Sequence, residues 1–174
     1  MIAMVTGAAG FIGSTLSRRL LAEGHTVVGV DCLTDAYDVE LKERNLEGLV
    51  DNADFQLVCA DLSRMVPWGV LDQVEVVFHL AGQASVTRSW GSSFGDYTRN
   101  NITATQDLLH ACVNSGLRRL VYASSSSVYG DAAVQPTHEA VLPRPISPYG
   151  VSKLAAEHLC LAYNREMGVP VTCL

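Results

Sequence analysis

The chain has 174 residues, of which 48% are apolar and 17% charged, and its net charge is −6 at neutral pH. The negative charge and the lack of a basic stripe argue against nucleic acid as a partner, and no apolar stretch is long enough to span a bilayer. Because Met1 stands one residue before the first apolar run, we expect no signal peptide, and we predict a cytoplasmic protein with no membrane partner.

The first predicted unit is a strand over 2–6, a glycine turn and a helix over 11–23. The apolar run from Ile2 to Thr6 leads directly into Gly7, Gly10 and Gly13, and an apolar-periodic segment follows. In such a unit, backbone N–H groups and the helix dipole bind a pyrophosphate, and glycine avoids a Cβ clash where the backbone turns sharply. The glycine spacing differs from that of the G-x-G-x-x-G fingerprint, so a purely structural turn is the alternative.

A second strand is predicted over 26–30, and Asp31 follows it, about twenty residues after the glycine turn. An acidic side chain at this point accepts hydrogen bonds from the adenosine ribose hydroxyls and repels a 2′-phosphate, which favours NAD over NADP. The alternative is an aspartate that only forms a turn. The polar segment 34–50 is interpreted as a loop with a short helix.

Further strands are predicted over 54–59, 75–80, 118–124 and 169–174, and helices over 89–115 and 149–167. The strands are aliphatic and β-branched runs unbroken by polar residues, which is typical of parallel strands buried on both faces. The fold class is therefore predicted to be α/β: a doubly wound parallel sheet with helices on both faces, in one domain over 1–174. Ligands of such sheets lie at the carboxyl ends of the strands.

Candidate binding residues follow the third and fourth strands. Asp61 is placed to accept from an adenine amino group, with Leu62 packed near the ring, and a helix N-cap is the equally weighted alternative for Asp61. The fourth strand is followed by a segment whose small residues let the backbone pass close to a cofactor: Leu80, Ala81, Gly82 and Gln83. Within the helix over 89–115, Asn100 is intrinsically unfavourable, which indicates a polar task such as bracing this loop. Asn101 is the alternative residue for that task.

Tyr149 and Lys153 stand four residues apart, directly after Pro148. If Pro148 lies in the first turn of a helix, the phenol and the ammonium lie side by side on one face. An ammonium at that distance favours the phenolate, so the pair is a candidate general base. The alternative is a solvated helix face.

The five cysteines, Cys32, Cys59, Cys112, Cys160 and Cys173, show no paired spacing. This pattern predicts reduced, mostly buried thiols, with no disulfide framework and no metal site.

Taken together, the motifs resemble the extended short-chain dehydrogenase/reductase family, and within it the NAD-dependent nucleotide-sugar epimerases and dehydratases. The resemblance rests on motifs in the expected order over the whole chain: Thr6 to Gly13, Asp31, Asp61-Leu62, His79 to Gly82, Asn100-Asn101, Ser124 to Gly130 and Tyr149 to Lys153. It implies a Rossmann-type fold, a homodimer and NAD as cofactor. The residues implied to bind NAD are Gly7, Gly10, Phe11, Ile12, Gly13, Asp31, Cys32, Asp61, Leu62, Leu80, Ala81, Gly82, Gln83, Asn100, Tyr149 and Lys153.

The resemblance also implies a catalytic group of Ser125, Tyr149 and Lys153. Ser125 matches the family's catalytic serine or threonine, whose hydroxyl hydrogen-bonds the substrate oxygen that Tyr149 deprotonates. Ser126 and Ser127 stand where similar 4,6-dehydratases carry an Asp-Glu pair and where decarboxylating relatives carry a glutamate at the second position. Serine cannot supply the proton donor and acceptor for elimination at neutral pH, which favours simple epimerisation.

The implied reaction is epimerisation at C4 of a UDP-sugar through a 4-keto intermediate, with NAD regenerated in each cycle. The segments 85–91 and 101–106 look most like UDP-glucuronate 4-epimerases, with UDP-glucose 4-epimerases next. Implied substrate contacts are Ser125, Ser126, Ser127 and Arg88, although an exposed arginine is the simpler interpretation of Arg88. The alternatives are a nucleotide-sugar dehydratase or decarboxylase and a non-catalytic NAD-binding module. Because the family's nucleotide-sugar domain would follow residue 174, we expect either an N-terminal fragment or a missing substrate site.

Overall fold

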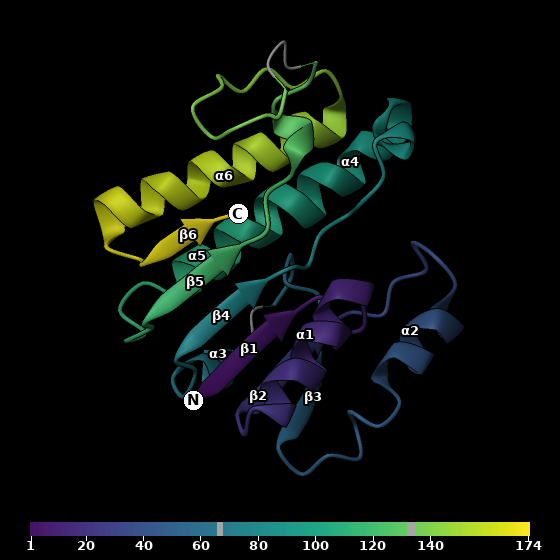
Figure 1. The fold of residues 1–174 in the computed structure, drawn as a ribbon, viewed down its shortest axis with the longest axis vertical. Coiled ribbons are helices and arrows are strands. Elements are labelled where there is room, and N and C mark those ends of the chain that lie inside the picture. The colour runs from purple at the N-terminus through teal and green to yellow at the C-terminus, as the bar shows by residue number, and fades with distance from the viewer. Residues whose placement is uncertain (66–67, 132–134) are drawn as a thin grey trace.

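The computed structural model describes residues 1–65, 68–131 and 135–174, with the side chain of Trp68 left out. Its centre is a parallel sheet of six strands in the order β3-β2-β1-β4-β5-β6, shown in Figure 1. The strands are β1 Ile2–Thr6, β2 Thr26–Asp31, β3 Phe55–Cys59, β4 Val76–His79, β5 Arg119–Tyr122 and β6 Val171–Cys173. The predicted α/β doubly wound fold is confirmed, and the predicted strands differ only by a residue or two at their ends.

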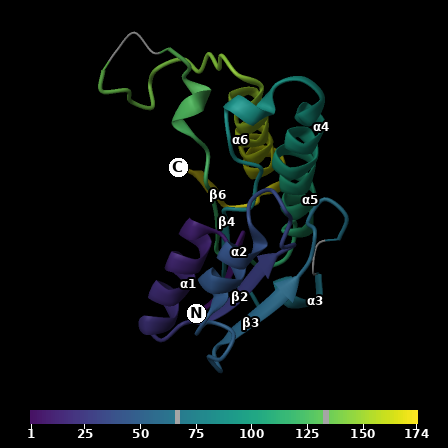
Figure 2. The same ribbon diagram turned by 90° about the vertical axis from the view of Figure 1, so that its right-hand side faces the viewer.

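Helices cover both faces of the sheet, as Figure 2 shows from the side. The α-helices are α1 Phe11–Ala22, α2 Val39–Leu46, α3 Trp68–Leu71, α4 Phe94–Tyr97, α5 Ala104–Ala111 and α6 Pro148–Met167. Short 3-10 turns lie at η1 Thr87–Ser89, η2 Gly91–Ser93 and η4 Ser126–Val128, and a π-helical segment lies at η3 Thr98–Thr103. In the described part of the chain, no helix is long and apolar enough to cross a membrane.

Neighbouring residues of β1 to β4 supply the two halves of the core, whereas β5 and β6 contribute to one half. Val5 and Val27 pack with Leu20 of α1 and Leu46 of α2 on one face. On the other face, Met4, Val28 and Leu120 pack with Leu108 of α5 and Cys160 of α6. This two-residue period explains why strands buried on both faces carry aliphatic side chains at successive positions.

The prediction of one continuous helix over 89–115 is wrong. Trp90 has extended backbone and Gly91 has φ +69°, and no α-helix begins until Phe94. The helix then changes to π-helical hydrogen bonding between α4 and α5, and it ends at Ala111, shortly before Asn114 with φ +63°. The segment 34–50 does contain the expected short helix: α2 begins after Asp38, whose carboxylate accepts from the N–H of Glu40 at 3.0 Å.

The prediction of mostly buried cysteines holds for only part of the set. All five thiols are free, and Cys112 and Cys160 are buried within the core. Cys32 and Cys59 are exposed, and both stand at the carboxyl ends of strands, where the sheet opens toward the ligand-binding edge.

Candidate active site

The glycine turn brings the start of α1 against the end of β1. Gly7 has φ +71°, and its N–H donates to the carbonyl of Val30 at 2.8 Å. A Cβ at Gly7 would lie 2.9 Å from the backbone nitrogen of Ala81, and a Cβ at Gly13 would overlap the carbonyl oxygen of Gly7. Both glycines are therefore required by close backbone approach, which explains why a spacing outside the usual fingerprint still forms the turn.

The first turn of α1 is open to a ligand. Its N-cap residue, Gly10, supplies no side-chain hydrogen bond, and the first N–H groups of any helix lack an intrahelical acceptor. The flanking side chains Phe11 and Ile12 are exposed. With the helix dipole, this terminus is suited to a phosphate.

Asp31 is buried at the end of β2, next to the glycine turn. One carboxylate oxygen accepts from the N–H of Ala9 at 3.0 Å, and the other accepts from the N–H of Leu33 at 2.9 Å. These bonds fix the carboxylate in the position that the sequence predicted for recognition of the ribose. They also show that Asp31 shapes a turn, so the two interpretations of this residue are compatible.

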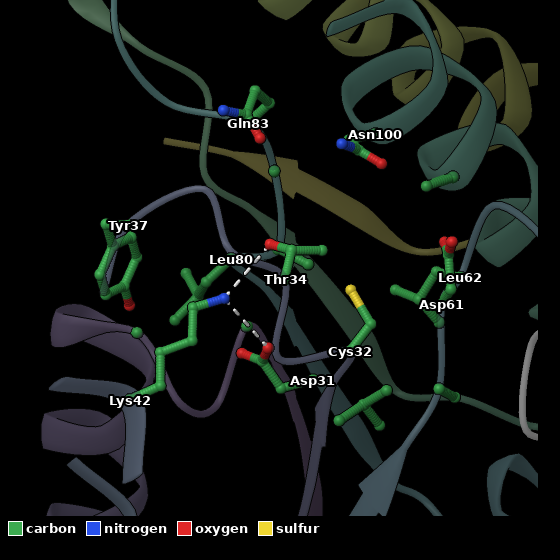
Figure 3. Close-up of a pocket in the computed structure, with 17 residues that line it drawn as sticks. Asp31, Cys32, Thr34, Tyr37, Lys42, Asp61, Leu62, Leu80, Gln83 and Asn100 are labelled. Carbon is green, nitrogen blue, oxygen red and sulfur yellow. Dashed lines mark hydrogen bonds and ion pairs between the residues drawn. The ribbon is translucent and has the colours of Figure 1, made fainter. Parts of the chain in front are cut away.

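Lys42 is a site residue that the sequence interpretation missed. Its ammonium lies 3.8 Å from the Asp31 carboxylate, 3.3 Å from the hydroxyl of Thr34 and 5.0 Å from the centre of the Tyr37 ring. In Figure 3 the Lys42 side chain reaches from α2 toward Asp31 and Thr34. The polar segment 34–50 gave no motif for this residue, although Asp38 before Val39 was a helix N-cap signal that would have placed Lys42 on a helix.

One cavity gathers most of the predicted cofactor residues (Figure 3). Those that line it are Gly7, Gly10, Asp31, Cys32, Asp61, Leu62, Leu80, Ala81, Gly82, Gln83 and Asn100. Residues that line it without having been predicted are Val30, Thr34, Tyr37, Lys42, Ala60 and Ala104. The carboxyl ends of β1, β2, β3 and β4 all contribute, which is the expected location for a ligand of this fold.

Asp61 lies in a turn and not at the start of a helix, so the predicted helix N-cap is wrong. It accepts from the N–H of Ser63 at 3.0 Å and from its hydroxyl at 2.7 Å, and it pairs with Arg64 at 3.4 Å. These bonds stabilise a turn after β3 in the manner of a cap. Asp61 also lines the cavity, as Leu62 does.

The loop after β4 is braced by Asn101, the alternative that the sequence left open, while Asn100 lines the cavity. The Asn101 side chain accepts from the N–H of Gln83 at 2.6 Å and donates to the Gln83 carbonyl at 3.1 Å and to the Ser152 hydroxyl at 2.9 Å. Gly82 leaves room beside it, because a Cβ there would lie 2.9 Å from the Asn101 side-chain oxygen. The π-helical turn that contains Asn101 thus connects the cavity loop to α6.

His79 is the buried centre of a second polar network. The Thr105 hydroxyl donates its proton to the Asn101 carbonyl at 2.6 Å, so it accepts from Nε2–H of His79 at 3.0 Å. Nδ1 therefore carries no proton and accepts from the Thr6 hydroxyl at 2.7 Å. Burial, and next the charge of Lys153, lower the pKa of His79 to about 3, which keeps the ring neutral. Because Thr6 also accepts from two N–H groups of the loop after β4, the network fixes that loop.

Lys153 lies inside the protein, so the solvated-helix interpretation of the Tyr149 and Lys153 pair is wrong. The first turn of α6 begins at Pro148, as predicted, and Ser147 caps it by accepting from the N–H of Gly150 at 3.0 Å. Lys153 is 7% exposed, its ammonium lies 4.4 Å from the centre of the Tyr122 ring, and burial lowers its pKa to about 8. The half-buried Tyr149 ring packs edge-on against Tyr97 at 6.2 Å between centres.

The serine segment after β5 lies against the start of α6. Ser125 caps η4 by accepting from the N–H of Ser127 at 3.1 Å, and Ser126 is exposed. A Cβ at Gly150 would lie 2.5 Å from the carbonyl oxygen of Ser127, so η4 and the first turn of α6 are in close contact. The fold thus brings the segment of Ser125 to the helix that carries Tyr149 and Lys153.

Arg88 does not join this group through its described contacts. Its guanidinium donates to the carbonyl of Ala36 at 3.0 Å, in the loop between β2 and α2, and the side chain is exposed. This is the simpler of the two interpretations that the sequence allowed.

Comparisons with known proteins agree with the geometry of the site. A model described as the NAD dependent epimerase/dehydratase family matches residues 3–174. The UDP-glucose 4-epimerase of Mycolicibacterium smegmatis is 42% identical over 160 residues, which cover 90% of this chain and 49% of that protein. The UDP-glucuronate 4-epimerase of Thermodesulfobacterium geofontis is 36% identical over 173 residues, which cover 97% of this chain and 53% of that protein.

Among solved structures, the UDP-glucuronic acid 4-epimerase from Bacillus cereus, in complex with UDP-glucuronic acid and NAD, has a TM-score of 0.96 with this chain at 41% identity. The match covers 99% of this chain and 55% of that one. This chain therefore spans about half the length of the relatives that it matches. The resemblance inferred from the motifs is confirmed, and the chain belongs to the NAD dependent epimerase/dehydratase family.

Proposed function

We propose that residues 1–174 are the NAD-binding domain of a UDP-sugar 4-epimerase, with UDP-glucuronate as the favoured substrate and UDP-glucose next. The observation that carries the proposal is the buried ammonium of Lys153, one helical turn from Tyr149 and on the helix that packs against the segment of Ser125. The 4-epimerase relatives support the choice of reaction. We extend the proposal to a cytoplasmic homodimer.

The residues present fit NAD. Gly7 and Gly10 line the cavity with backbone alone, α1 offers an uncapped N-terminus, and Asp31 offers a fixed carboxylate. We assign the adenosine ribose to Asp31 and the pyrophosphate to the start of α1. When bound, NAD supplies reversible oxidation at C4 with no net redox change.

In this proposal Tyr149 removes the proton from the sugar 4-hydroxyl and later returns it. Ser125 hydrogen-bonds the same oxygen, and Lys153 stands one helical turn from Tyr149 on α6. Since the pKa of Lys153 is about 8, the ammonium is the main form at neutral pH. The neighbouring Ser126 and Ser127 offer hydroxyl groups but no carboxyl group, so elimination of water or loss of carbon dioxide has no acid–base pair at this position.

A non-catalytic NAD-binding module is the contrasting hypothesis. Such a module needs the glycine turn, Asp31 and a lysine for the cofactor, but it has no need of a phenol one helical turn from that lysine or of a serine segment packed against the same helix. The combination of Ser125, Tyr149 and Lys153 therefore favours an enzyme.

The test compares the parent protein with the Tyr149→Phe variant, both produced at the full length found in the source organism. We expect the variant to bind NAD with unchanged affinity in calorimetry and to lose at least about a hundredfold in turnover of UDP-glucuronate to its C4 epimer, followed by NMR. Val151→Ala changes an exposed side chain on the same helix and serves as the control. Equal turnover in parent and Tyr149→Phe would show that Tyr149 is not the base.

A further inference from the structure

Lys42 and Asp31 form a buried pair of opposite charges on one side of the proposed cofactor cavity. The side chains are 7% and 8% exposed, and their charged atoms lie 3.8 Å apart. Among the described residues that line the cavity, Lys42 is the one cation, and Asp31 and Asp61 are the anions. Asp61 has its own cationic neighbour in Arg64, so Lys42 and Asp31 are each other's principal charge partners.

Neither member of the pair is saturated by its contacts. The Asp31 carboxylate accepts two backbone N–H bonds, which leaves acceptor capacity on both oxygens. The Lys42 ammonium has three donors and one hydrogen-bond contact, to Thr34 at 3.3 Å. At 3.8 Å the two groups attract each other without a direct hydrogen bond, so each keeps bonding capacity for a ligand in the cavity.

Resting on the proposed NAD site, we infer that Lys42 is a specificity-determining residue and that coenzyme choice depends on the pair and not on Asp31 alone. In the parent protein the carboxylate accepts from the ribose 2′-hydroxyl and neutralises the ammonium. A 2′-phosphate would lie beside the same carboxylate and would be repelled. If the carboxylate is removed, the same phosphate lies within reach of an unpaired buried ammonium, which then binds it.

Lys42 is thus a potential phosphate-binding residue whose charge Asp31 neutralises in the parent protein. Loss of Asp31 alone should convert the cavity from NAD-selective to tolerant of NADP. Loss of both charges should not make the cavity tolerant of NADP, because no cation remains at that point to balance the phosphate. In the simpler view, Asp31 excludes NADP by repulsion alone, and the gain in NADP affinity on losing Asp31 would not require Lys42.

The experiment measures NAD and NADP affinities by calorimetry at low ionic strength for the parent, Asp31→Asn, Lys42→Met and the double variant. Asp31→Ser is made alongside Asp31→Asn, because an amide group at this position would face the N–H of Ala9 or Leu33. Arg44→Met, alone and with Asp31→Asn, is the matched control: it removes the same charge from an exposed position on the same helix. Thermal unfolding verifies that each variant is folded.

We expect Asp31→Asn or Asp31→Ser to raise the affinity for NADP about tenfold. When Lys42→Met is added to the Asp31 variant, most of this gain should be lost, whereas Arg44→Met added to the same variant should keep it. In the parent background, Lys42→Met should lower NADP affinity by about threefold or more, a result that does not depend on the Asp31 variants folding. An NADP gain that survives Lys42→Met, or NADP affinity unchanged by Lys42→Met in the parent, would overturn this inference while leaving the NAD site intact. Failure of the parent to bind NAD would overturn the proposed function, and this inference with it.

Discussion

Asp31 and Lys153 are buried charges in two different regions of the site, and the fold treats them differently. Asp31, at the end of β2, has two backbone N–H donors and the ammonium of Lys42 as partners. Lys153, on α6, lies over the ring of Tyr122, and burial lowers its pKa to about 8. The cofactor region surrounds its charge with donors and a counter-ion, whereas the region proposed for catalysis leaves its charge poorly compensated.

This difference matches what each region is proposed to do. A recognition group works best when its position and charge are fixed before the ligand arrives. A group that favours a phenolate works best when its charge is incompletely satisfied by the protein, because the phenolate then supplies the missing interaction.

The largest effect is expected from Gly13→Ala, which disrupts the backbone of the cofactor region. The added Cβ would overlap the carbonyl oxygen of Gly7, and because this atom belongs to the backbone, the turn itself must move. We expect a loss of about 4 kcal/mol or more in the free energy of unfolding, measured with urea, and loss of NAD binding. Gly95→Ala, in open space on α4, should have little effect on either property. A Gly13→Ala protein as stable as the Gly95→Ala control would contradict the close approach.

A smaller effect is expected from Lys153→Met, which tests the uncompensated charge. The pKa of Lys153 is about 8 in the folded protein, against 10.5 for an unperturbed lysine. Between these values the unfolded chain binds more protons, so the stability of the parent rises with pH, and the cost of the buried charge is greatest below pH 8. Relative to Lys153→Met, the parent should gain up to about 3 kcal/mol from pH 8 to 10.5.

Urea unfolding at a series of pH values measures this difference. Arg165→Met removes an exposed charge from the same helix and should shift the stability by a similar amount at every pH. If the parent and Lys153→Met differ by a constant amount from pH 7 to 11, the pKa of Lys153 is not lowered by the fold, and the contrast with Asp31 is lost.

The smallest effect is expected from Asn101→Leu, which tests the link between the two regions. The variant leaves the backbone N–H and carbonyl of Gln83 and the hydroxyl of Ser152 without their side-chain partner. We expect a loss of about 2 kcal/mol in stability and faster hydrogen exchange in the loop after β4. Asn100→Leu replaces the neighbouring residue, which makes none of these bonds, and should change the stability far less. Equal losses in the two variants would show that the bracing contacts contribute little.

The sequence alone determined the parts of this protein that depend on short-range pattern. Unbroken aliphatic runs located the strands, because a strand buried on both faces has no polar side. Gly7, Asp31 and the turn before Tyr149 were found because backbone conformation and helix capping are properties of a few consecutive residues.

Tertiary structure decided what depends on contacts between distant segments. Nothing near Lys42 in the sequence marks it, and it joins the site only because α2 packs beside the end of β2. The choice between Asn100 and Asn101 followed from the π-helical turn, which sequence periodicity did not predict. The burial of Lys153 was likewise invisible, because an exposed helix face and one packed over the Tyr122 ring can carry the same residues at the same spacing. Burial sets the cost of a charge, and burial is fixed only when the whole chain has folded.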